Sequence, residues 1–118
     1  LSALHDAGLL KAAAHITGGG ITDNLPRVLP EGTVAEISLS SWPELPVFPL
    51  LKQIGNMPDD DYRRTFNTGI GMIFVISERK AAKAEKVLKG LSETAYWIGR
   101  IEKAKGKTAA AEGQVRYR

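Results

Sequence analysis

The sequence contains no cysteine among its 118 residues, which excludes disulfides, thiolate metal sites and a cysteine nucleophile. It has two histidines, His5 and His15, and no carboxylate cluster beside His15, so no metal ligand is predicted in this chain. No apolar run approaches the ~18 residues that a membrane span requires. With no signal-peptide pattern and no cysteine, we expect a cytoplasmic protein that does not contact a membrane.

The chain has the composition of one ordinary globular domain, with 43% hydrophobic and 25% charged residues. Leu1 is not an initiator methionine, and the sequence starts abruptly within an apolar pattern. We therefore expect residues 1–118 to be a piece of a longer protein.

The net charge of +3 is unevenly distributed. Residues 1–77 carry five basic and eight acidic side chains, whereas residues 78–118 carry eleven and five. A basic segment could bind nucleic acid, but such surfaces usually interleave aromatic residues with the basic ones. The lysines at 80, 83, 86 and 89 have no aromatic residue among them, which favours a solvated helix face. A basic module that binds RNA or protein remains the alternative, although no nucleic-acid partner is expected.

Hydrophobic periodicity predicts an α/β (α+β-like) fold in three layers, with helices packed on a mixed sheet of about four strands. The strands are expected near 33–39, 69–77, 94–103 and 114–118, with the last at an edge. The run 69–77 is almost continuously apolar and should be the most buried strand, covered on both faces. Helices are expected near 1–10, 22–29 and 42–54, from Pro58, and over 78–91. Residues 11–16 should be a short extended segment, and 104–113 a loose turn.

The stretch "AHITGGGITDNLPRVLP" (14–30) places Gly18, Gly19 and Gly20 directly before a helix start. Glycine is costly to order, so the run indicates either a sharp strand-to-helix turn or a loop whose exposed N–H groups bind an anion. His15 precedes the loop, where it is either a structural histidine or a group for binding and acid–base chemistry. For Gly19→Val we expect a large loss of ligand affinity with the fold retained.

A second stretch, "DDDYRRTFNTGIGM" (59–72), combines three aspartates, two arginines and a polar run. The aspartates at 59–61 could bind Mg²⁺, but carboxylates that favour the positive end of a helix are the better account. Arg63 and Arg64 could clamp a phosphate, or one of them could be a surface charge. We expect His15, Thr17 to Gly20, Arg64 and Asn67 to line one face of a cleft.

These stretches, with "SSWPELPVFPLLKQIGNM" (40–57) and "AYWIGRI" (95–101), resemble the C-terminal domain of the phosphoribosylformylglycinamidine cyclo-ligase family, also called aminoimidazole ribonucleotide synthetases. The resemblance covers nearly the whole chain. Counting back from Thr65 matches Arg64 to the family's arginine and leaves the role of Arg63 open. Thiamine-phosphate kinases, selenophosphate synthetases and hydrogenase-maturation proteins of the same superfamily are alternatives.

The resemblance implies a domain of an ATP-dependent enzyme that closes the imidazole ring of formylglycinamidine ribonucleotide in purine biosynthesis. It implies a homodimer of two-domain chains, in which an N-terminal domain, absent from residues 1–118, holds most ligands of ATP and Mg²⁺ and the dimer contact. The site residues expected here are His15 as a catalytic candidate and, for substrate or phosphate, Thr17, Gly18, Gly19, Gly20, Arg64, Thr65, Asn67 and Gly69. By itself this chain is expected to be inactive.

Overall fold

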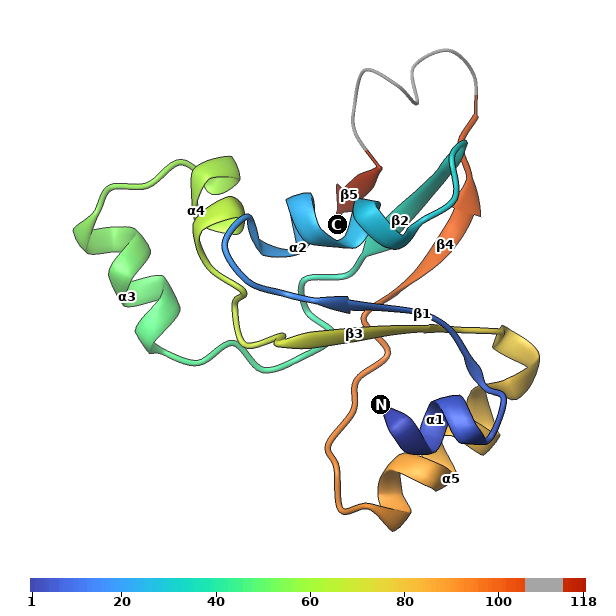
Figure 1. Cartoon of the computed structure of the whole chain (residues 1–118). Coiled ribbons are helices and arrows are strands. Elements are labelled where there is room, and N and C mark those ends of the chain that lie inside the picture. Colours follow the sequence, from blue (N-terminus) through green and yellow to red (C-terminus); the bar gives the residue numbers. More distant parts are fainter. Residues whose placement is uncertain (106–113) are drawn as a thin grey trace.

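The structure, a computed structural model, describes residues 1–105 and 114–118, along which short helices alternate with strands (Figure 1). In chain order the elements are α1 (Ser2–Asp6), β1 (Leu10–His15), α2 (Gly20–Asn24), the 3-10 helix η1 (Leu25–Val28), β2 (Thr33–Ile37), α3 (Val47–Ile54), α4 (Asp59–Thr65), β3 (Met72–Ile76), the 3-10 helix η2 (Glu78–Lys80), α5 (Ala81–Gly90), β4 (Gly99–Lys103) and β5 (Val115–Tyr117). The predicted mixed α/β class is confirmed. Most of the loose turn expected at 104–113 lies outside the described residues.

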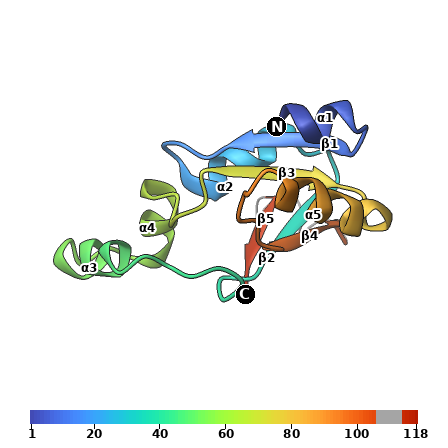
Figure 2. The ribbon, with the colours of Figure 1, turned by 90° about the horizontal axis from the view of Figure 1, so that it is seen from below.

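The described strands form two sheets, so the expectation of one mixed sheet of about four strands is wrong. Strands β1 and β3 pair antiparallel, while the second sheet has the order β4-β2-β5, with β2 antiparallel to β4 and parallel to β5. Figure 2 shows the β1–β3 pair on one side of the molecule and the other three strands on the opposite side. The segment 11–16, expected only to be extended, supplies the partner of β3. Side-chain alternation reports which face of a strand is buried and not which strand lies beside it.

The main core lies between the two sheets and the α2–η1 segment. Its buried members are Ala14, Ile16, Ile21, Leu25, Ala35, Ile37, Trp42, Ile70 and Ile73. A smaller cluster of Leu4, Leu9 and Ala84 joins α1 to α5. The placement of Trp42 in the core agrees with the prediction, whereas Trp97, also expected in the core, is 52% exposed.

The most buried strand is β2, and the prediction that 69–77 would be most buried is wrong. In β2 the side chains of Val34, Ala35 and Ile37 are buried, whereas in β3 only Ile73 is. The reason is position: β2 lies between two strands, and β3 has β1 as its one neighbour in the described sheets. A hollow of about 590 Å³ opens between β3, β4 and α5 and leaves much of the apolar surface of β3 uncovered.

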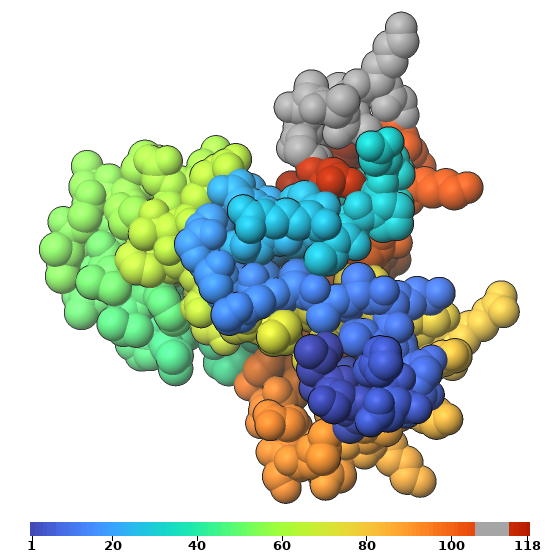
Figure 3. Space-filling view, viewed as in Figure 1, coloured from blue at the N-terminus to red at the C-terminus, as the bar shows by residue number. Residues whose placement is uncertain are grey.

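The helix expected over 42–54 is shorter and less buried than predicted. Helix α3 begins at Val47, directly after Pro46, and none of its residues is buried. The apolar face that should have packed inward is exposed, with Ile54 at 73%. In Figures 1 and 3 the segment that holds α3 and α4 forms a lobe beside the rest of the molecule. Helix α4 begins at Asp59 after Pro58, as predicted.

Candidate functional site

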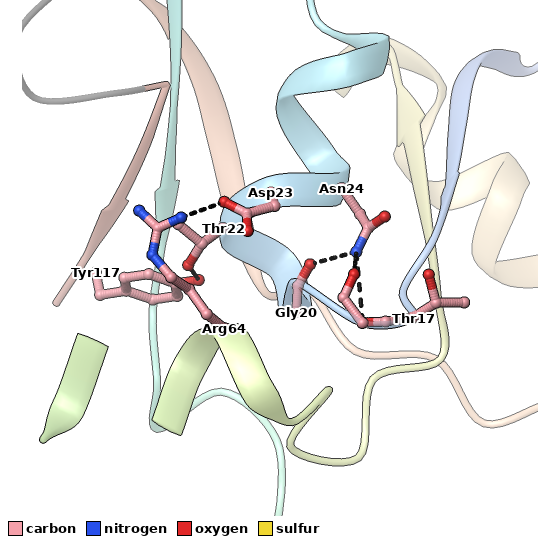
Figure 4. Close-up of polar contacts among 8 residues, drawn as sticks. Thr17, Gly20, Thr22, Asp23, Asn24, Arg64 and Tyr117 are labelled. Carbon is pink, nitrogen blue, oxygen red and sulfur yellow. Dashed lines mark hydrogen bonds and ion pairs between the residues drawn. The ribbon is translucent and has the colours of Figure 1, made fainter. Parts of the chain in front are cut away.

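The glycine stretch forms a turn whose carbonyl groups converge on one buried side chain, Asn24 of α2. The Nδ2 group of Asn24 donates to the carbonyl oxygens of Gly20 at 2.8 Å, Gly18 at 3.1 Å and Thr17 at 3.4 Å (Figure 4). A buried amide with such partners supplies donors to the carbonyl groups of the tight turn and ties the turn to α2. Sequence reasoning missed Asn24. The feature of the sequence that could have pointed to Asn24 is a polar residue placed between two apolar residues, Ile21 and Leu25, which are both in the core.

The turn packs directly on the end of α4. At Gly20 φ is +60°, and a Cβ atom there would lie 1.8 Å from the carbonyl oxygen of Arg63 and 3.0 Å from that of Phe66. At Gly19 φ is +97°, and its N–H group donates to the carbonyl oxygen of Arg64 at 2.8 Å. Two of the three glycines are thus required by the backbone conformation and by the close approach of α4.

Of the two interpretations of the glycine run, the loop with exposed N–H groups does not hold for Gly19 and Gly20, whose N–H groups are already hydrogen-bonded. The N–H group of Gly19 donates to the carbonyl oxygen of Arg64, and that of Gly20 donates to the carbonyl oxygen of Thr17 at 3.0 Å. For Gly19→Val the structure predicts strain in the turn in addition to the expected loss of affinity, because a Cβ at Gly19 would lie 2.8 Å from the Cβ atom of Asp23. Gly18 differs: among the described residues, no atom lies within 4 Å of the Cβ that a side chain would add there.

Arg64 and Arg63 contact different partners. Arg64 forms an ion pair with Asp23 of α2, 41 residues away in sequence (Figure 4). Arg63 is more enclosed, with its guanidinium 4.9 Å from the ring centre of Tyr117 and ion pairs to Asp59 at 3.6 Å and Asp60 at 3.7 Å. An anion that binds Arg64 must therefore compete with Asp23. Arg63, whose role the sequence left open, contacts Tyr117 and so links α4 to β5.

The polar residues after α4 hold the local backbone. The hydroxyl of Thr65 donates to the carbonyl oxygen of Asp61 at 2.7 Å, and Oδ1 of Asn67 accepts from the N–H group of Gly69 at 2.9 Å. These groups therefore shape the turn between α4 and β3. His15 is exposed at the end of β1, where it pairs with Met72.

The predicted site residues meet in part. The structure brings the turn of Thr17 to Gly20 against residues 63–66. His15 and Asn67 lie outside this contact, in the segments that contain β1 and precede β3. These two segments are joined by a hydrogen bond of 2.9 Å from the N–H group of Ile16 to the carbonyl oxygen of Gly71. Of the predicted site residues, Gly69 alone lines one of the two main hollows in the described part of the chain. That these residues line one face of a cleft stays a prediction.

The second hollow, of about 170 Å³, borders α4. It is lined by Ile21, Leu39, Trp42, Glu44, Lys52, Asp59, Tyr62, Arg63, Phe66, Thr68 and Tyr117. Its polar groups are paired with one another: the Tyr62 hydroxyl donates to Glu44, and Lys52 donates to Asp59. The hydrogen bond and charge of Lys52, with the charge of Arg63, lower the pKa of Asp59.

Residues 1–105 and 114–118 contain no group of three histidine or acidic side chains that could hold a metal ion. In the same residues, no helix is long and apolar enough to cross a membrane.

Residues 1–112 match the family described as "AIR synthase related protein, C-terminal domain", and the chain belongs to this family. It is 47% identical over 98 residues to the phosphoribosylformylglycinamidine cyclo-ligase of Ligilactobacillus salivarius, an alignment that covers 83% of this chain and 28% of that protein. It is 46% identical over 105 residues to the bifunctional purine biosynthetic protein purD of Dictyostelium discoideum, with coverage of 89% and 13%. The resemblance found in the sequence is thereby confirmed, and the chain spans less than a third of these relatives.

A crystal structure of thiamine-monophosphate kinase from Stenotrophomonas maltophilia has a similar fold. Its TM-score is 0.60 at 17% sequence identity, and the match covers 93% of this chain and 32% of that one. At this identity the likeness concerns the fold alone.

Proposed function

We propose that this chain is the C-terminal domain of a two-domain phosphoribosylformylglycinamidine cyclo-ligase of purine biosynthesis. The longer enzyme converts formylglycinamidine ribonucleotide to aminoimidazole ribonucleotide with ATP and Mg²⁺ and works as a homodimer in the cytoplasm. The 47% identity to a cyclo-ligase, over 28% of its length, supports this proposal. So does the match to a C-terminal domain family over residues 1–112.

In this enzyme, the surface formed by the glycine turn and the end of α4 is one side of the substrate site. The observation that carries this role is the direct contact between the two motif stretches, through Gly20 against the Arg63 carbonyl and through the Gly19–Arg64 hydrogen bond. On this surface Thr17 and the Arg64 side chain are exposed, and His15 is exposed nearby in the chain, at the end of β1. The ribonucleotide phosphate, being more highly charged than a carboxylate, displaces Asp23 from Arg64. Gly18 allows the ligand to approach the backbone.

The rest of the site comes from the preceding domain. The described residues hold no metal-binding cluster, so the Mg²⁺ that accompanies ATP is held mainly by residues outside them. When bound, this ion neutralises the charge that develops on the transferred phosphoryl group. The residues of this chain bind and orient the substrate. The isolated chain therefore catalyses no turnover.

The test compares the longer protein of the parent gene with residues 1–118 alone. We expect the longer protein to release ADP in a reaction that depends on formylglycinamidine ribonucleotide, and to form aminoimidazole ribonucleotide detectable by mass spectrometry. The isolated chain should do neither. Failure of the longer protein to form this product, or turnover by residues 1–118, would overturn the proposal.

A matched pair of variants tests the role of the surface. Arg64→Gln removes a guanidinium from it, and Arg100→Gln removes an exposed guanidinium from β4. For Arg64→Gln we expect KM for the ribonucleotide to rise about tenfold or more, the effect of losing one charge-assisted contact. Arg100→Gln should leave it unchanged. Equal effects of the two variants would remove Arg64 from the substrate site.

A further inference from the structure

Strand β5 ends in a side chain that contacts both halves of the candidate site. The strand pairs with β2, where Tyr117 is opposite Ile37. Two backbone hydrogen bonds of 2.9 Å anchor Arg118, one from its N–H group to Ile37 and one to its carbonyl oxygen from Leu39. The residues that match the family end at 112, so this strand lies beyond the part of the chain that the family describes.

The side chain of Tyr117 reaches α2 and α4 at the same time. Its hydroxyl lies 2.8 Å from the hydroxyl of Thr22, and its ring lies 4.9 Å from the guanidinium of Arg63 (Figure 4 shows the Thr22 contact). Thr22 lies in α2 two residues after Gly20, and the carbonyl oxygen of Arg63 in α4 packs on Gly20. One side chain thus joins three segments that are up to 95 residues apart.

The two helices need such support because they are short. Helix α2 has five residues and α4 has seven, and helices of this length are not stable without tertiary contacts. The ion pair between Arg64 and Asp23 is exposed and contributes little. The contacts of Tyr117 are partly buried, where hydrogen bonds and cation–π contacts are stronger.

We propose that Tyr117 is a positioning residue, which holds α2 and its glycine turn in a fixed orientation against α4. Its importance for substrate binding rests on the function proposed above, whereas the structural link does not. Burial raises the pKa of Tyr117, so the phenol stays protonated at neutral pH and keeps its hydroxyl contact.

Amide hydrogen exchange of the 118-residue chain tests the link directly. The Gly19 amide reports on the contact between the turn and α4, the Ile16 amide on the first sheet, and the Arg118 amide on the pairing of β5, because each makes a defined backbone hydrogen bond. We expect Tyr117→Leu to speed exchange at Gly19 about tenfold or more while Ile16 and Arg118 change much less. Tyr117→Phe keeps the ring and should give a smaller effect. The control, Tyr96→Leu, changes a tyrosine that is 45% exposed and should alter none of the three.

The second measurement is kinetic and uses the longer protein. We expect Tyr117→Leu to raise KM for formylglycinamidine ribonucleotide more than it lowers kcat, and Tyr117→Phe to recover most of the loss. Unchanged exchange at Gly19, or equal acceleration at all three amides, would overturn the inference. Faster exchange at Gly19 with unchanged KM would overturn its role at the site. If the longer wild-type protein has no cyclo-ligase activity, the proposed function fails while the exchange data still decide the structural link.

Discussion

Gly20→Ala should destabilise this fold far more than the same change two residues earlier. The added Cβ would lie 1.8 Å from the Arg63 carbonyl oxygen, whereas real contacts of this kind essentially never fall below 3.0 Å. The turn and α4 must therefore separate by roughly 1.2 Å, the difference between these two distances. Such a shift stretches the 2.8 Å hydrogen bond from Gly19 to Arg64.

The expected magnitude follows from these separate costs. A non-glycine residue in the left-handed region costs about 1–2 kcal/mol, and overpacking costs about 1–3 kcal/mol more. We therefore expect a loss of about 2–5 kcal/mol in the free energy of unfolding, a large share of the roughly 5–15 kcal/mol that stabilises a domain. The melting temperature should fall by on the order of 10–20 °C.

Urea denaturation followed by circular dichroism measures this loss, with Gly18→Ala as the control. The Cβ that this control adds would meet no described atom within 4 Å, so its stability should stay within about 0.5 kcal/mol of wild type. If Gly20→Ala and Gly18→Ala differ by less than about 1 kcal/mol, the close packing of the turn on α4 is not what makes glycine necessary at position 20.

Three further predictions concern buried polar groups. Asn24→Asp replaces the donor to three carbonyl oxygens by a carboxylate, and urea denaturation should show a loss of about 2–4 kcal/mol; a neutral effect would contradict the role of Asn24 in the turn. Trp42→Phe removes the 3.0 Å hydrogen bond to the carbonyl oxygen of Thr68, and thermal melts should show a loss of about 1–3 kcal/mol, with no loss if that bond is unimportant. Burial and the hydrogen bond to Glu44 raise the pKa of Tyr62 above its ordinary 10.0, so its contribution to stability is complete below pH 10.0 and is lost as the pH rises further. Between about pH 10 and about pH 12, unfolding free energy should fall more steeply for wild type than for Tyr62→Phe, and equal slopes would contradict this assignment.

The sequence by itself determined the local elements and the family. Proline followed by three aspartates places the start of α4 at Asp59, because proline suits the first turn and carboxylates favour its positive end. Alternating apolar residues predict β2, and a lysine-rich amphipathic pattern predicts α5. These signals are local, since each depends on residues a few positions apart.

The glycine run shows where local reasoning ends. The sequence showed that glycine at 18–20 needs a reason, but both a turn and an anion loop satisfied the pattern. Glycine is needed at position 20 because the backbone carbonyl of Arg63, 43 positions away, lies against it. A backbone contact of this kind leaves no mark in the type of side chain at position 63. The competition of Asp23 for Arg64 is also invisible in the sequence, because it joins side chains of two helices that only the fold brings together.

Only the tertiary structure decided which strands pair and which apolar faces are covered. The apolar residues of the run 69–77 predict a central strand. Burial of β3 depends instead on whether other strands lie on both sides of it, which the run itself does not encode. The exposed face of α3 has the same origin: the helix pattern is present, but none of the residues of α3 is buried by the fold. Tyr117 meets Thr22 across 95 residues, because β5 returns beside β2 and carries the ring to α2. Contacts of this range depend on the path of the whole chain, which no short stretch of residues encodes.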